Sequence, residues 1–260
     1  TSALHVARTG LEAQDARMRV IANNLANIGT TGYKRDRANF ATLAYQDSRI
    51  AGQQSSNETQ YATGLNLGTG VSVQSTTSIT TQGTLSTTGN ALDFALDGDG
   101  YFQVQLPGGK LGYTRAGNFS RSAEGQLVTA QGYPVQPAIA IPEDAASITV
   151  GPDGTVSVTT SASSTPTEIG QITVASFANS AGLQALGDNF LAETAASGPA
   201  QIGAPGDGTR GSIKQGMLEA SNVNVFEELV DMIECQRAYE INSKMISSVD
   251  EMLRNANQTL

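Results

Sequence analysis

The chain has few of the residues that carry most catalytic and metal chemistry. Its 260 residues include one cysteine, one histidine and no tryptophan, and aromatic residues make up only 5%. Cys235 alone can form neither a disulfide nor a thiolate metal site within one chain, so we interpret it as a small packed residue. His5 alone cannot build a metal site, and as the only possible base it leaves no credible Ser-His-Asp arrangement. We therefore expect no enzyme, no catalytic residue, no cofactor and no metal.

Positive charge and long apolar runs are also scarce. The chain has 15 basic and 24 acidic residues, for a net charge of −9. A nucleic-acid partner is not expected, because no basic stripe exists that could replace phosphate counterions. The one basic cluster, Lys34, Arg35 and Arg37, is interrupted by Asp36 and is typical of a solvated segment. No run approaches the length of a membrane-spanning helix and no secretory signal is visible, so these features alone predict a cytoplasmic protein.

Helical patterns occupy the two ends of the chain. Over residues 1–28 and again over 223–260, apolar residues recur in steps of three and four, which indicates helices with a heptad seam. Asn224 and Glu227 have the spacing of an N-terminal capping box. The residues expected to pack on these seams, inside the subunit or between subunits, are Leu4, Leu11, Met18, Ile21, Leu25 and Ile28 in the first helix and Leu229, Met232, Ile233, Tyr239, Ile246 and Leu253 in the second.

The middle of the chain has the pattern of short β-strands. From residue 68 onward apolar residues alternate with Ser and Thr, and glycine-containing turns separate the strands. Residues 97–100, Asp-Gly-Asp-Gly, resemble the start of a calcium loop but lack its closing glutamate, so we interpret them as a two-residue hairpin turn. The polar segment 46–67 is expected to form an exposed loop or an extended hairpin.

Together these patterns predict an α+β fold. The terminal α-helices pair as a coiled-coil-like inner domain, and the middle forms a β-rich domain. The expected parts are a helical polymerisation domain of residues 1–32 plus 224–260, a connecting segment with an extended loop of 33–67 plus 204–223, and a β-rich outer domain of 68–203. Seams at opposite ends of a chain must either meet across the fold or be buried against other molecules. The second option makes the chain a building block of a polymer.

Long stretches of the chain resemble the signatures of the bacterial flagellar basal-body rod and hook family. The resemblance spans nearly the whole chain, and the length and the middle stretches are most similar to the distal rod members. The stretches that carry it are 9–14, 20–27 and 31–35 near the N-terminus, 96–104, 113–119 and 136–142 in the middle, and 218–230, 232–233, 236–240, 242–244 and 250–253 near the C-terminus.

The resemblance implies a structural subunit of the flagellar distal rod. Such a subunit self-assembles into a rigid hollow drive shaft that transmits torque to the hook and encloses the export channel. A proximal rod or hook subunit is the alternative within the family. A secreted cell-wall enzyme is the alternative from another class, and the missing catalytic constellation argues against it.

The resemblance also implies partners and a location. The partners are further copies of the chain, proximal rod and hook proteins, the surrounding P-ring and L-ring proteins, and the flagellar type III export apparatus. The location is the basal body, where the rod crosses the periplasm to the outer membrane after export without a cleaved signal peptide, which replaces the cytoplasmic prediction. Asn23, Asn24 and Asn27 then become candidates for lining the channel or for hydrogen bonds between helices. Segment 46–63 becomes a candidate for locking neighbouring subunits.

Overall fold

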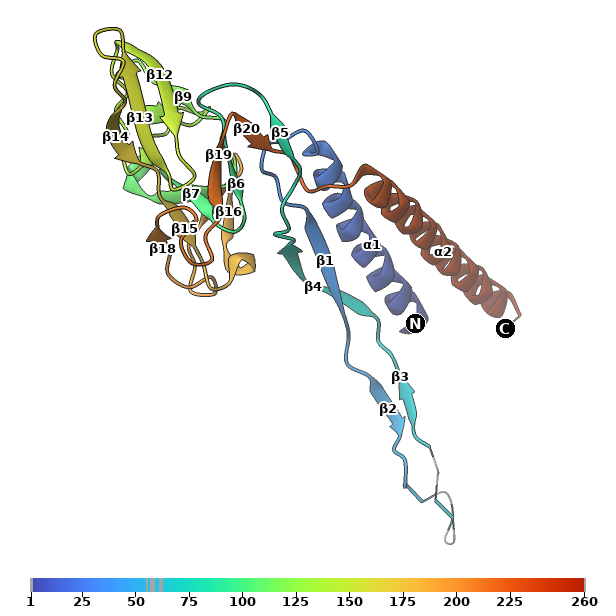
Figure 1. The fold of residues 1–260 in the computed structure, drawn as a ribbon. Coiled ribbons are helices and arrows are strands. Elements are labelled where there is room, and N and C mark those ends of the chain that lie inside the picture. Colours follow the sequence, from blue (N-terminus) through green and yellow to red (C-terminus); the bar gives the residue numbers. More distant parts are fainter. Residues whose placement is uncertain (1, 55, 57–58, 61–62, 260) are drawn as a thin grey trace. The chain divides into compact units, whose positions relative to one another are not determined.

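The computed structural model describes residues 2–54, 56, 59–60 and 63–259. The chain falls into two compact units. The first comprises Thr1–Leu25, Asp36–Thr77 and Asn224–Leu260, and the second comprises Ala26–Arg35 and Ser78–Val223. The first unit holds two long helices and a β-hairpin, and the second consists mainly of β-strands (Figure 1). The predicted α+β class, with paired terminal helices and a β-rich middle, is confirmed. The coiled-coil geometry of the helix pair stays a prediction.

Helices α1 (Ser2–Ala26) and α2 (Val225–Gln258) form where the sequence predicts them. α2 begins after Asn224, whose side-chain oxygen accepts the N–H of Phe226 at 3.0 Å and satisfies a donor of the first turn. Glu227 in that turn complements the partial positive charge of the helix end. The predicted cap residue is therefore confirmed. No helix in the described part of the chain is long and apolar enough to span a membrane.

A long hairpin lies in sequence between the two parts of the second unit, Ala26–Arg35 and Ser78–Val223. β1 (Asp36–Thr42) pairs with β4 (Val71–Ser78), and β2 (Gln46–Arg49) pairs with β3 (Leu65–Leu67). Close to α1 the hairpin requires a glycine, because Gly70 has a φ of +120° and an added Cβ would lie 2.2 Å from the Thr9 hydroxyl oxygen. That hydroxyl accepts the N–H of Val71 at 3.3 Å. Of the two structures predicted for segment 46–67, its described residues form the extended hairpin.

The second unit is built around a sheet of seven strands. The strand order is β16 (Gln184–Gly187), β17 (Phe190–Ala192), β8 (Leu111–Thr114), β7 (Tyr101–Gln105), β15 (Val174–Ser176) and β18 (Gln201–Gly203), and β11 (Val135–Gln136) pairs with β7. A three-stranded sheet contains β12 (Ala145–Val150), β13 (Thr155–Thr160) and β14 (Thr167–Gln171). Three further pairs are β6 (Phe94–Asp97) with β19 (Ser212–Gln215), β5 (Leu85–Thr87) with β20 (Met217–Glu219), and β9 (Ser120–Arg121) with β10 (Leu127–Val128). Short 3-10 turns lie at η1 (Pro107–Gly109) and η2 (Ser180–Gly182).

The core of this unit lies on both faces of β7. Successive side chains of a strand point to opposite faces. Phe102 and Val104 are fully buried, and Phe102 belongs to the larger apolar cluster, whereas Tyr101 packs with Tyr113 and Ala175 in the smaller one. With no tryptophan available, aliphatic side chains and phenylalanines fill the larger cluster. Its buried members are Phe94, Leu96, Phe102, Phe119, Leu127, Val135, Ile139, Ile141, Val150, Val156, Ile172, Val174 and Ile213.

The turn at residues 97–100 connects two strands that do not pair with each other. β6 pairs with β19, and β7 pairs with β8, β11 and β15. The prediction of a hairpin turn is therefore wrong, although strands flank the turn as expected. Gly98 and Gly100 have φ values of +126° and +127°, and an added Cβ on Gly100 would lie 2.2 Å from a methyl group of Val174. The glycines let the chain leave β6 and enter β7 through a space that is too narrow for a side chain.

Candidate functional surface

Asn24 and Glu228 form a buried polar contact between the two helices. Each residue is 1% exposed. The amide nitrogen of Asn24 lies 3.3 and 3.4 Å from the carboxylate oxygens of Glu228, and it donates to the carbonyl oxygen of Asp36 at 2.9 Å. The amide oxygen of Asn24 accepts the N–H of Asp36, also at 2.9 Å. One side chain therefore connects the end of α1 with the starts of β1 and α2, and buried polar groups of this kind require such partners.

Charged and small residues continue this contact along the helices. Arg17 forms ion pairs with Asp231 at 3.5 Å and Glu234 at 3.3 Å, and their partial exposure keeps the contribution of each pair small. The thiol of Cys235 donates to the carbonyl oxygen of Gln14 at 3.1 Å. Cys235 is buried, and burial raises the pKa of its thiol, so the residue is a packed thiol rather than a reactive thiolate.

The two helices also approach each other closely at Gly10. A Cβ added there would lie 3.0 to 3.2 Å from the side-chain amide of Asn242. The partners of Gly10 and Asn24 are Asn242 and Glu228, so residue numbers rise along α1 as they fall along α2. The helices are therefore antiparallel, and Figure 1 shows them side by side. We call this contact the polar seam; it consists of Gly10, Gln14, Arg17 and Asn24 on α1 and Glu228, Asp231, Glu234, Cys235 and Asn242 on α2.

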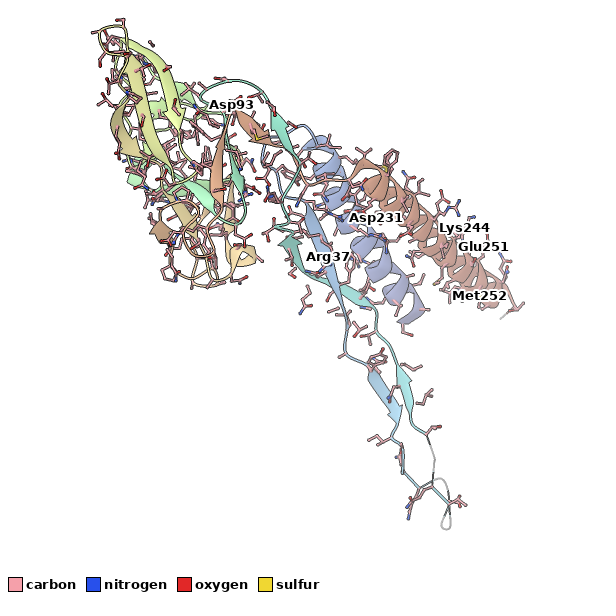
Figure 2. All side chains as sticks on the ribbon, in the orientation of Figure 1. Arg37, Asp93, Asp231, Lys244, Glu251 and Met252 are labelled. Carbon is pink, nitrogen blue, oxygen red and sulfur yellow. The ribbon has the colours of Figure 1, made fainter. Side chains whose placement is uncertain are left out.

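Large apolar side chains occupy a different face of α2. Their spacing of three, four, seven and eight residues places them on one side of the helix. Lys244, which lies among them in sequence, and Met252 project from the helix into solvent (Figure 2). An exposed apolar face of this length marks a surface that binds another molecule. We call it the apolar stripe; it consists of Phe226, Val230, Ile233, Ile241, Met245 and Met252, which are 45% to 80% exposed.

The structure places the predicted seam residues in several environments. Ile21 is buried. Leu4, Leu11, Met18, Leu25, Met232 and Ile246 are half-buried. Ile28, Leu229, Ile233, Tyr239 and Leu253 are exposed. The contact between the helices uses Gly10, Arg17 and Asn24, each one position before a predicted residue. A search for apolar periodicity overlooks these positions because they are polar or lack a side chain.

The three candidate asparagines also differ. Asn23 is exposed, Asn24 lies in the polar seam, and Asn27 accepts a hydrogen bond from the hydroxyl of Thr30 at 3.1 Å. Sequence reasoning included Ile233 but missed the other five members of the apolar stripe. Their helical spacing is visible in the sequence, on a face of the helix next to the predicted heptad seam.

No metal-binding cluster accompanies these surfaces in the described ranges. Among residues 2–54, 56, 59–60 and 63–259, no three or more His, Cys, Asp or Glu side chains gather closely enough to hold a metal ion. The distinctive features of the first unit are therefore a polar contact inside the subunit and an uncovered apolar face. They define a structural protein that binds other macromolecules.

Comparison with known proteins identifies the family. Residues 4–34 match the model "Flagella basal body rod protein", residues 95–158 match "Flagellar hook protein FlgE/F/G D1 domain", and residues 214–259 match "Flagellar basal body rod FlgEFG protein C-terminal". The flagellar basal-body rod protein FlgG of Buchnera aphidicola subsp. Schizaphis graminum is 50% identical over 98% of both chains. FlgG of Agrobacterium fabrum is 47% identical over 96% of both. FlgF of Caulobacter vibrioides is 34% identical over 93% of this chain and 90% of its own.

The chain belongs to the flagellar basal-body rod and hook family. It is a structural rod subunit of the bacterial flagellum and not an enzyme. Its location is the rod of the basal body, so the cytoplasmic location suggested by composition alone is wrong.

Proposed function

We propose that copies of this chain assemble into the distal rod, a rigid hollow drive shaft that transmits torque to the hook and encloses the export channel. The observation that carries this proposal is the apolar stripe of α2, whose side chains are 45% to 80% exposed in the described part of the chain, although Asn24 and Glu228 of the polar seam are buried. The similarity to FlgG proteins over almost the full length supports the distal rod over a proximal rod or hook subunit, which stays the alternative.

The free energy available from burying the apolar stripe indicates that each subunit contacts several other subunits rather than one. Burying six such side chains would contribute on the order of 10 kcal/mol, counted at about 1.5–3 kcal/mol for each full burial. Bringing two subunits together costs a similar amount, about 4–15 kcal/mol. A single pair of subunits is therefore marginal. A helical polymer, in which every copy contacts several others, gains enough to be stable.

The remaining assignments follow from the same proposal. Partners are further copies, proximal rod and hook proteins, the P-ring and L-ring proteins, and the type III export apparatus. The rod crosses the periplasm, and the chain reaches it without a cleaved signal peptide. Residues 1–32 plus 224–260 form the inner layer, 33–67 plus 204–223 the connection, and 68–203 the outer wall. Asn23 and Asn27 face the channel or a neighbouring helix. Proposed contacts between copies also include Leu4, Leu11, Met18, Leu25, Ile28, Leu229, Tyr239 and Leu253, which are half-buried or exposed in one chain.

Two isoleucines of α2 provide a matched test. Ile241 is 63% exposed in the apolar stripe, whereas Ile246 is half-buried one turn beyond Asn242, which faces α1. Ile241→Asp should leave the subunit folded and abolish assembly, because a charge would be desolvated only in the polymer. Ile246→Asp should instead lower the stability of the subunit itself.

The measurements are circular dichroism with urea unfolding of the subunit, electron microscopy of concentrated protein, and swimming motility. Glu240→Gln, at an exposed polar position of α2, is the control and should assemble normally. Normal tubes and full motility from Ile241→Asp would refute the assembly surface.

A further inference from the structure

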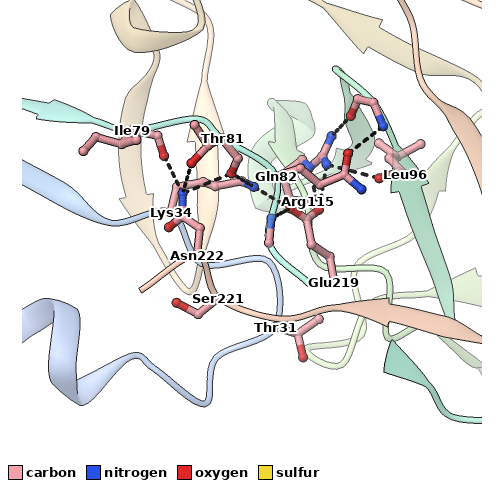
Figure 3. A network of polar contacts seen from close by, with 12 residues as sticks. Thr31, Lys34, Ile79, Thr81, Gln82, Leu96, Arg115, Glu219, Ser221 and Asn222 are labelled. Atoms are coloured by element: carbon pink, nitrogen blue, oxygen red, sulfur yellow. Dashed lines mark hydrogen bonds and ion pairs between the residues drawn. The ribbon is translucent and has the colours of Figure 1, made fainter. Parts of the chain in front are cut away.

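Glu219, at the end of β20, lies at the centre of a buried polar cluster in the second unit (Figure 3). Its carboxylate accepts hydrogen bonds from Arg115, with Nε at 2.8 Å and Nη2 at 2.7 Å. It also forms a short ion pair with the ammonium group of Lys34. The side chains of Glu219, Arg115 and Lys34 are 0%, 6% and 9% exposed. One carboxylate therefore neutralises two buried cations.

Two backbone amides show how closely other segments approach this residue. The N–H of Gly83 donates to the Glu219 carboxylate at 2.9 Å, and the N–H of Gly32 donates to the Glu219 carbonyl oxygen at 2.8 Å. A Cβ added to Gly83 would lie 1.9 Å from the carbonyl oxygen of Ala220. Gly32 has a φ of +69°, which only glycine adopts readily. These amides form their hydrogen bonds only when Glu219 is in place.

Arg115 extends the cluster into the core. Its guanidinium donates to the carbonyl oxygens of Leu96 at 3.2 Å, Gly98 at 2.7 Å and Gly100 at 2.9 Å. It thereby holds the turn between β6 and β7, the two strands next to the larger apolar cluster. The position of Arg115 in the core and the position of Glu219 near the end of the unit are therefore coupled.

Asn222 makes a second set of contacts beside Glu219. Its side-chain oxygen accepts the N–H of Arg35 at 2.7 Å, and its side-chain nitrogen donates to the carbonyl oxygens of Ile79 at 2.8 Å and Thr81 at 3.1 Å. The N–H of Ile79 donates to the carbonyl oxygen of Arg35 at 2.8 Å, and that of Asn222 to Tyr33 at 3.3 Å. Three segments far apart in the sequence are thus bonded to one another.

Chain order gives this cluster a consequence for folding. Every chain is synthesised from its N-terminus, so Lys34 and Arg115 exist long before Glu219. Without Glu219, closing the core would bury two cations without their shared anion, which is strongly unfavourable. Burial already lowers the pKa of Lys34 even with the carboxylate present. β19, which pairs with β6, and β20 belong to the same late segment.

We infer that Glu219 is the closing residue of the second unit: the unit stays open until residues 212–222 dock, and it then closes in one step. This requirement for Glu219 keeps the part of the chain before residues 212–222 from folding before those residues are present. The inference goes beyond the polymer proposed above and does not depend on it.

The first test uses the unaltered full chain. During refolding from urea, pulsed hydrogen exchange follows the amide of Gly83, which reports when the Glu219 carboxylate is in place. The amides of Phe94–Leu96 and Phe102–Val104 should gain protection in the same kinetic phase as Gly83. Protection of these core amides in an earlier phase than Gly83 would overturn the inference.

The second test compares three variants of the full chain. Glu219→Gln should speed amide exchange in β6 and β7 by about 100-fold or more, because a broken buried ion pair leaves uncompensated charge. Exchange in α1 and α2 should not change. Lys214→Gln, exposed on β19, is the matched control and should behave as the unaltered chain.

The double variant Lys34→Met/Glu219→Gln separates charge from simple loss of contacts. It should exchange about tenfold more slowly than Glu219→Gln, because one uncompensated cation has been removed. Exchange as fast as that of the single variant, or faster, would mean that Glu219 contributes only local hydrogen bonds. Fast exchange confined to residues 31–35, 82–84 and 217–222 would lead to the same conclusion.

Discussion

At Asp153, in the turn between β12 and β13, a fully exposed carboxylate has two hydrogen-bond donors from one neighbour. The N–H of Thr155 lies 3.2 Å from Oδ1, and the Thr155 hydroxyl lies 2.9 Å from Oδ2. These two bonds, the backbone one first, lower the pKa of Asp153 below its ordinary value of 3.8. The charged form is therefore favoured in the folded chain. Its contribution to stability is present above the ordinary pKa and is lost as the pH falls below it.

Thr155→Val tests this pair, because it removes the hydroxyl donor but keeps the backbone N–H and the shape of the side chain. The pKa of Asp153 should move upward, toward its ordinary value, without reaching it. Carboxyl chemical shifts measured by NMR between about pH 2 and 7, a range that spans the usual titration of aspartate, would report the change. An unchanged pKa of Asp153 would assign the shift to the backbone bond alone.

At the scale of elements, the polar seam explains what the sequence did and did not predict. The bounds of both helices and the cap at Asn224 were predictable, because they depend on local periodicity and capping. The face through which the helices meet was not predictable from local patterns. Its central contact joins Asn24 and Glu228, which lie 204 positions apart in the sequence. For the same reason Lys34, interpreted as solvated, proved to be buried against Glu219. The pairing of β6 with β19 is equally non-local.

Asn24→Asp should weaken the helix pair strongly. It would place a carboxylate against the buried carboxylate of Glu228 and remove the amide donor. The free energy of unfolding should fall by about 2 kcal/mol or more at pH 7, since an unpaired buried polar group costs about 1–3 kcal/mol and a charge costs more.

Asn23→Asp, at the exposed neighbouring position, is the control for this experiment. Urea unfolding of both variants at pH 7, followed by circular dichroism, gives the comparison. Equal stabilities of the two variants at pH 7 would contradict the role of Asn24 in the polar seam.

At the scale of the whole molecule, we expect the long hairpin of β1 to β4 to contribute only in an assembly. Tyr45, Ile50, Leu65 and Leu67 are 44% to 66% exposed along it. Apolar side chains in such an extended arm gain little in an isolated chain, but they can pack on neighbouring copies. We expect this contact to fix the spacing of subunits and so to make the rod straight and stiff.

Deletion of residues 46–63 tests this expectation. The polar seam and the apolar stripe would remain, so polymers should still form, but they should be curved or flexible. The curvature of single polymers in electron micrographs is the measurement. Replacing the segment with glycine and serine at equal length separates loss of the contact from shortening of the chain. Straight polymers of unchanged stiffness from both variants would rule out segment 46–63 as the lock.

The contacts of Asn222 have a mechanical consequence. The chain passes between the two units after residues 25, 35, 77 and 223. Three of these passages lie within two residues of Arg35, Ile79 and Asn222, which are hydrogen-bonded to one another inside the second unit. A pulling force that enters this unit through any one of these three chain segments is therefore shared with the other two. Asn222→Ala should lower the rupture force of the second unit in single-molecule pulling, because the side-chain bonds of Asn222 to Arg35, Ile79 and Thr81 would be lost and only the backbone bonds would still connect the segments.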